Sequence, residues 1–315
     1  MIKLLSTFFL ISASCFLFAQ QDRQLTFYSF DGMSFNPAIT GFKGYTGTMI
    51  YRNQWDKVEN APNTTLFNVQ GNLDNIIHVP GAIGLGLSFN NDAIGSVRQN
   101  NLKLNGAYHI QTPIGKFSTG LGLGFLQMAI DGEWITPTDP IAMDPTISNL
   151  VNKVAETKFD FNGGLYYTNR TGYIGFSTTH LAEADYQQMS YTSQRHYYVL
   201  AGTHFNVGNN RQFELKPSVL IKADGATAVF DFNIRAEYDL MNSQTVWVGA
   251  TYRFSDGAGL MAGMSLGDLS FGYALEFMTN RMKVWGSGSH ELMIQYSIFP
   301  PAKKIIRTVC PHILM

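Results

Sequence analysis

Apolar and polar side chains alternate with a period of two residues along much of the chain. Between residues 230 and 240 every even position is apolar, whereas the odd positions hold Asp231, Asn233, Arg235, Glu237 and Asp239. This alternation predicts a β-strand with one apolar and one polar face. The segment is longer than the usual strand of about five or six residues and matches the length with which a tilted strand crosses a bilayer.

The same alternation recurs at 102–110, 159–167, 246–254 and 292–298. Expected strands begin near Gly44, Asn63, Ala82, Arg98, Lys116, Lys158, Gly172, His196, Gln212, Val229, Thr245, Gly259, Leu269 and Ser289. The pattern predicts an all-β fold, a transmembrane antiparallel β-barrel of about fourteen strands, since bacterial barrels have an even strand number. Several strands direct polar groups inward, as a wet lumen requires.

Five glycines fall at alternate positions of two predicted strands: Gly84, Gly86, Gly120, Gly122 and Gly124. They share one face, which we expect to be the inside of a crowded barrel where backbone or a plug approaches closely. A phosphate-binding loop is the alternative for 120–124. It is disfavoured because no Gly-Lys-Ser/Thr follows and the spacing of a dinucleotide fingerprint is missing.

The N-terminus has the pattern of a cleavable secretory signal peptide. Lys3 precedes a mostly apolar run from residue 4 to 18, and Ala19 stands before polar residues. These features predict export and cleavage after Ala19. A lipoprotein signal with Cys15 as the lipidated residue is the alternative, but the apolar run continues past Cys15. We therefore expect a signal peptide at 1–19, an outer-membrane β-barrel at 20–299 and a C-terminal tail at 300–315.

Composition narrows the function classes. Charged residues make up 14% of the chain and the net charge is −1, which argues against nucleic acid as a partner. After cleavage Cys310 is the one remaining cysteine, so no intramolecular disulfide is expected. Outside the signal peptide no apolar run approaches the ~20 residues of a spanning helix, so membrane insertion would use strands.

No catalytic pattern is found, and neither an enzyme nor a cofactor is expected. The chain lacks a His-Glu-x-x-His motif, a Gly-x-Ser-x-Gly elbow and a Cys-x-x-Cys pair. Three histidines could lie on strand faces, where placement in the lumen or at an interface is favoured over metal binding: His109, His196 and His204. No metal site is therefore predicted.

Two long connections are expected on the same side of the barrel, at 131–156 and at 182–194. The first contains the Asp-Pro pairs at Asp139 and Asp144. Carboxylates in this connection could bind calcium, but Asp-Pro pairs are more simply explained as residues that form turns. Long barrel loops tend to be extracellular, so these segments would cap the pore or touch a partner.

Several short motifs carry a family resemblance. They are Phe35-Asn36-Pro37-Ala38, Tyr51-Arg52-Asn53-Gln54-Trp55, Gly84-Leu85-Gly86-Leu87, Ala107-Tyr108-His109-Ile110, Tyr252-Arg253 and Gly288-Ser289-His290-Glu291. With these motifs, nearly the whole mature chain resembles the PorP/SprF family of Bacteroidota. That resemblance implies an outer-membrane barrel that works with the type IX secretion and gliding apparatus.

The resemblance also implies partners. These would be the C-terminal domain of a secreted surface adhesin, components of the type IX machine and outer-membrane lipid. The alternative function is a passive porin or a hydrophobic-substrate channel. The candidate site positions are Asn36, Pro37, Arg52, Asn53 and Trp55, as structural or partner contacts.

Simpler structural roles exist for these positions. Asn36-Pro37 would form a turn leading into the first strand. Arg52 would pair with a lumen carboxylate, and Trp55 would lie in an interfacial girdle.

Overall fold

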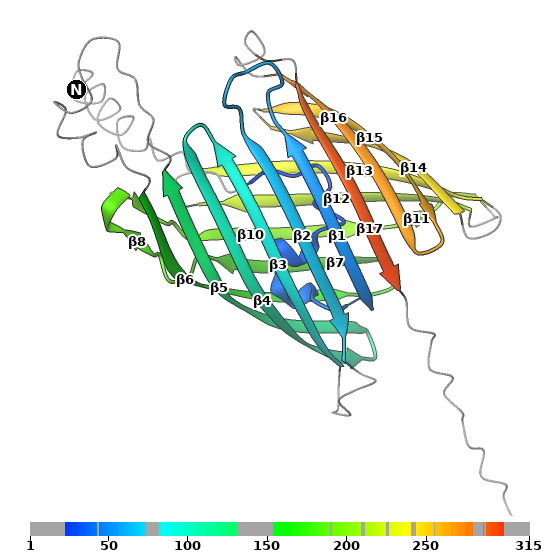
Figure 1. The fold of residues 1–315 in the computed structure, drawn as a ribbon. Helices are drawn as coiled ribbons and strands as arrows, with labels where there is room; N and C mark the ends of the chain where they lie inside the picture. The colour runs from blue at the N-terminus through cyan, green and yellow to red at the C-terminus, as the bar shows by residue number, and fades with distance from the viewer. Residues whose placement is uncertain are drawn as a thin grey trace, which may run out of the picture.

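The fold is a closed antiparallel β-barrel (Figure 1). The computed structural model describes residues 23–42, 44–73, 82–130, 154–189, 191–208, 212–224, 227–240, 244–254, 256–279, 286 and 288–298. Within these residues consecutive barrel strands are hydrogen-bonded neighbours, β1 pairs with β17, and β10 pairs with β12. The barrel therefore has no seam, and its described strands number fourteen, as the alternation predicts.

The barrel strands are β1 (Tyr45–Asn53), β2 (Asn63–Asn72), β3 (Ala82–Ile94), β4 (Val97–Thr112), β5 (Gly115–Ile130), β6 (Val154–Thr168), β7 (Gly172–Thr179), β10 (His196–Thr203), β12 (Phe213–Ala223), β13 (Ala228–Asp239), β14 (Gln244–Arg253), β15 (Gly257–Leu266), β16 (Leu269–Met278) and β17 (Ser289–Ile298). Short elements accompany them: α2 (Gly32–Phe35), η1 (Pro37–Ile39), β8 (Asp185–Tyr186), η3 (Gln187–Met189), β9 (Tyr191–Thr192) and β11 (Phe205–Asn206). Most strands begin within two residues of their expected starts. β6 begins at Val154, so the connection predicted at 131–156 is shorter at its C-terminal end.

Alternation places apolar side chains outside and polar ones inside, as predicted. On β13, Phe230 and Phe232 are exposed to the surroundings of the barrel, whereas Asp231 and Asn233 are buried in the lumen. Similar exposed apolar rows lie on most of the other strands. This outer surface would be unfavourable in water and suits the hydrocarbon of a bilayer.

The two ends of the barrel differ. At one end, here called the turn mouth, residues 113–114, 169–171 and 267–268 make tight turns between strands. At the other, called the loop mouth, β1 is joined to β2 by 54–62, and β7 to β10 by 180–195. The second of these connections contains the β8–β9 hairpin. The predicted loops 131–156 and 182–194 both start from the loop mouth, since β5 and β7 end there.

The described N-terminal segment, residues 23–42, runs inside the barrel (Figure 1). It carries α2 and η1, and η1 contacts β4, β5 and β6. We call this segment the plug. It starts near β12 at the loop mouth, where Lys222 approaches the Arg23 carbonyl, and ends near Gly71 and Gly84 toward the turn mouth. The chain therefore crosses the lumen before it enters β1.

Three predictions fall on other parts of the chain. The signal peptide at 1–19, the tail at 300–315 and the Asp-Pro turns within 131–153 lie outside the described residues. Among the residues that the structure does describe, no helix has the length and apolar character needed to span a membrane.

Candidate functional site

The plug fills the lumen with an apolar core. Leu25, Phe27, Tyr28 and Phe35 of the plug are fully or almost fully buried. They pack with inward side chains of the wall, among them Ile50, Leu66, Leu200, Leu220, Trp247, Met261 and Met293. Burial of a large apolar side chain contributes about 1.5–3 kcal/mol, so the plug and the wall stabilise each other. The lumen is thus a packed interior over this part of its length.

Inward glycines form the seat of the plug. A Cβ on Gly164 would lie 2.9 Å from Asn36 Cγ, and one on Gly120 would lie 2.6 Å from Ala38 Cα. At Gly84 an added Cβ would lie 2.7 Å from the Thr40 carbonyl carbon. Since real Cβ atoms do not approach so closely, no other residue fits without movement. The expectation that Gly84 and Gly120 mark a close approach of a plug is confirmed.

Asn36 fixes the plug to two wall strands at once. Its Nδ2 donates to Leu165 O of β6 at 2.9 Å and to Phe176 O of β7 at 3.3 Å. Its Oδ1 accepts from the Ala38 backbone N–H at 2.9 Å, which caps the 3₁₀ turn begun by Pro37. The predicted Asn-Pro turn is present, but it lies inside the barrel. The amide side chain supplies the two N–H donors and the acceptor oxygen that these three bonds use.

Further polar contacts tie the plug to the rest of the wall. They are His109 Nε2 to Thr40 O at 2.9 Å, Gln295 Nε2 to Phe30 O at 3.2 Å, Ser177 Oγ to Phe35 O at 2.7 Å, Tyr28 Oη with Ser218 Oγ at 3.0 Å and Asn68 Nδ2 to Asp31. The anchors come from β2, β4, β7, β12 and β17, around the whole circumference. A plug held from all sides has one well-defined position.

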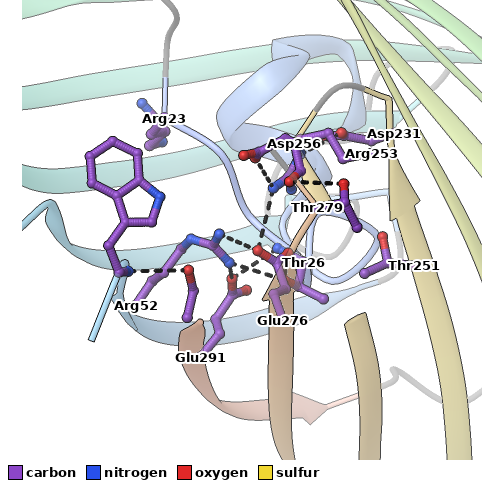
Figure 2. Close-up of polar contacts among 12 residues, drawn as sticks. Arg23, Thr26, Arg52, Asp231, Thr251, Arg253, Asp256, Glu276, Thr279 and Glu291 are labelled. Carbon is purple, nitrogen blue, oxygen red and sulfur yellow. Dashed lines mark hydrogen bonds and ion pairs between the residues drawn. The ribbon is translucent and has the colours of Figure 1, made fainter. Parts of the chain in front are cut away.

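A buried ionic cluster lies inside the barrel near the loop mouth (Figure 2). Arg52 pairs with Glu276 and with Glu291, the latter at 2.9 Å. Arg253 pairs with Asp231 at 2.6 Å and with Glu276 at 3.4 Å. Both arginines and both partners of Arg52 are almost completely buried. We call Arg52, Asp231, Arg253, Glu276 and Glu291 the Arg52 cluster.

The Arg52 cluster also forms hydrogen bonds with the start of the plug. Glu291 accepts hydrogen bonds from two consecutive plug amides, Thr26 N and Phe27 N, each at 2.8 Å. The Thr26 hydroxyl donates to Glu276 and accepts from Arg52. Hydrogen bonds to ionised groups are stronger than neutral ones. The charges of the wall therefore hold the plug backbone directly.

The structure places the candidate positions in different surroundings. Asn36 and Pro37 seat the plug, and Arg52 has the lumen carboxylate partners that the sequence predicts. Asn53 ends β1, between Asn63 and His290 on the neighbouring strands. Trp55 follows in the loop, half-buried and at a positive φ of 53°. Its backbone N–H donates to Ser289 Oγ at an N···O distance of 3.4 Å. Its predicted place in a girdle stays a prediction.

Sequence reasoning did not single out Glu276 of the cluster or Thr26 of the plug, and it placed Asp231 only on the polar face of its strand. Glu276 stands between the apolar Leu275 and Phe277, so period-two alternation was the available signal that it faces inward. Among the described histidines, His180 and His196 lie together, with ring centroids 5.6 Å apart. Within the described residues no group of three or more His, Cys, Asp or Glu side chains is placed to hold a metal ion.

A cavity of about 400 Å³ lies between the plug and the wall toward the turn mouth. Phe30, Ile39 and Phe42 of the plug line it together with polar wall residues. Arg235 also lines the cavity. Its guanidinium carbon lies 4.3 Å from the centroid of the Phe30 ring, and the guanidinium forms an ion pair with Glu237. The plug therefore leaves an open pocket on this side, while its other side is packed.

Comparisons with solved structures find other membrane barrels. The Pseudomonas putida toluene transporter TodX shares 11% identity over 82% of this chain and 90% of its own, with a TM-score of 0.45. A BamA of Haemophilus ducreyi lacking POTRA domains 1–3 shares 8% identity over 81% and 70%, with a TM-score of 0.43. A mutant porin of Rh. blastica shares 8% over 81% and 98%, with a TM-score of 0.33.

Among curated proteins no sequence matches. A family model matches, and its description is "Type IX secretion system membrane protein PorP/SprF". The match runs over residues 17–296, which includes the plug, every barrel strand except the end of β17, and the Arg52 cluster. This chain is a member of the PorP/SprF family of type IX secretion membrane proteins.

Proposed function

We propose that the protein is an outer-membrane component of the type IX apparatus that binds a polypeptide, and not a pore. The partner would be the C-terminal region of a secreted surface protein or a periplasmic part of the machine. The observation that carries the proposal is the plug, which is packed and bonded into the lumen from the loop mouth inward. A barrel blocked by its own chain favours a role in holding a partner over one in passing solutes.

The loop mouth is assigned to the cell exterior in this proposal. Outer-membrane barrels have short periplasmic turns and longer outer loops, and the two longest connections, 131–153 and 180–195, both start at the loop mouth. The turn mouth, with the cavity under the plug, would then face the periplasm. A secreted protein would meet the loop mouth, and a machine component would meet the turn mouth.

A pull-down from native outer membranes tests the proposal. The tagged protein is solubilised in mild detergent, purified and analysed by mass spectrometry, with an identically tagged porin of the same membrane as control. We expect enrichment of one large secreted protein or of type IX components over the control. A partner-free barrel that conducts ions in planar bilayers would contradict the proposal and favour the passive porin or hydrophobic-substrate channel.

A further inference from the structure

β6 extends past its neighbour β7 at the loop mouth. β5 pairs with β6 along its whole length, from Val154 to Thr168. β7 pairs only with the part from Gly163 to Thr168. In the described part of the chain the remainder of β6 has a strand on one side only. Residues 154–160, here called the β6 edge, therefore form a strand edge without a second backbone partner among the described residues.

The backbone itself ends the ladder at this point. Leu181 N–H donates to Phe161 O at 3.0 Å, which adds one backbone hydrogen bond beyond the last β6–β7 pair. His180 adopts a positive φ of 57° and Glu183 one of 44°, so the chain leaves the β7 ladder. β8 and η3 then lie against β6, where Gln188 N–H donates to the Glu156 carboxylate at 2.6 Å. Left-handed backbone at residues other than glycine is uncommon and needs support from its surroundings.

Three residues direct their backbone groups toward the open side. In an antiparallel strand the N–H and C=O of one residue point to the same neighbour, and successive residues alternate. Since Phe161 O faces Leu181, the groups of Ala155, Thr157 and Phe159 face the same way. No backbone hydrogen bond joins these three to a second neighbour among the described residues. They offer three donors and three acceptors in a row.

The side chains define what would fit. Phe159 faces outward and packs on Phe125 and Phe161, with ring centroids 5.4 and 4.6 Å apart. On the inner face Glu156 and Lys158 form an ion pair at 3.3 Å. An added strand would thus meet an aromatic surface on one face. On the other it would meet the Glu156–Lys158 pair, in which Glu156 also accepts from Gln188 N–H at 2.6 Å. Cross-strand pairing favours a segment with alternating apolar and polar residues there.

We infer that the β6 edge binds an extended segment of the exported polypeptide by strand addition. The inference rests on the proposed function and names how the partner is held. Native edges are commonly blocked by proline, bulges or charged side chains. Residues 154–160 contain no proline, and Glu156 and Lys158 are paired with each other. A second copy fits less well. Two barrels in one membrane share their orientation, so their β6 strands could pair only in parallel.

A proline variant tests the contribution of the β6 edge alone. Thr157 directs its N–H to the open side, so Thr157→Pro removes that donor and leaves the β5–β6 ladder intact. We expect it to recover at least about tenfold less of the exported polypeptide in the pull-down. Thr157→Val is the matched control, since it changes the side chain and keeps the N–H. Unchanged heat-modifiable migration of both variants shows that the barrel is folded.

Hydrogen exchange gives a reading that does not depend on a variant. The amides of Ala155, Thr157 and Phe159 should exchange fast in the partner-free protein and at least about a hundredfold more slowly in the complex. Slow exchange in the partner-free monomer, or slowing caused by self-association alone, would overturn the inference. Equal recovery by Thr157→Pro and the natural protein would overturn it while the proposed function stands. If the natural protein recovers no polypeptide, both fail.

Discussion

Replacement of Arg52 by methionine is expected to lower the free energy of unfolding by about 3–5 kcal/mol. Methionine retains the bulk of the side chain but leaves Glu276 and Glu291 buried with fewer cations. Glu276 keeps Arg253 at 3.4 Å, whereas Glu291 pairs with no other described cation. A buried carboxylate without a counter-charge is costly, and the two plug amides offset only part of that cost for Glu291. Urea unfolding of the protein in lipid vesicles measures the change.

The same variant should loosen the plug. Because Glu291 holds the amides of Thr26 and Phe27, hydrogen exchange at these two positions should speed up. Arg195→Met is the matched control, since Arg195 and its partner Glu183 are both more than 40% exposed. An exposed pair contributes about 0–1 kcal/mol. An Arg52→Met protein as stable as the Arg195→Met protein would contradict the role given to the cluster.

Gly164→Ala is expected to lower the free energy of unfolding by about 1–3 kcal/mol and to displace the Asn-Pro turn. The added Cβ would overlap Asn36 Oδ1 and lie 2.9 Å from its Cγ. Asn36 would have to move, and its bonds to Leu165 O and Phe176 O would be lost. Urea unfolding measures the stability, and amide exchange at Ala38 reports on the turn.

The neighbouring glycine supplies the control for this prediction. At Gly163 an added Cβ would meet nothing closer than Leu181 Cδ1 at 3.9 Å, an ordinary contact. Gly163→Ala should therefore match the natural protein or exceed its stability slightly, since alanine reduces the freedom of the unfolded chain. Equal effects of the two substitutions would show that the seat is not tightly packed.

The strands could be predicted from the sequence because their signal is local. Alternation between Phe230 and Leu240 needs no knowledge of the rest of the chain, and the lumen position of Asp231 follows from it. The same rule predicted the inward face of Gly84 and Gly120. It missed the start of β6 at Val154, since the long connection before it gave no clear boundary.

The plug could not be predicted in this way. Residues 23–42 have no period-two pattern, and the sequence assigned them to the barrel together with the strands. Phe27 and Phe35 are buried by side chains that lie far away in the chain. The sequence predicted only that the lumen is crowded.

The partners of Arg52 depend on closure of the barrel. Glu276 and Glu291 lie on β16 and β17, and they reach Arg52 because β17 pairs with β1. The motifs around Arg52, Arg253 and Glu291 were noted separately for their family resemblance. Their meeting in one cluster is a property of the tertiary structure alone. Likewise, the β6 edge follows from the stagger between β6 and β7, which local patterning does not set.

Single-channel recording in planar bilayers tests the central claim most directly, namely that the plug closes the barrel. The natural protein is compared with a variant that lacks residues 24–40, whose heat-modifiable migration shows that the barrel has formed. We predict no steady conductance for the natural protein and steady open currents for the deletion variant. Steady currents of equal size from both would contradict the account, because the lumen would then be open with the plug in place.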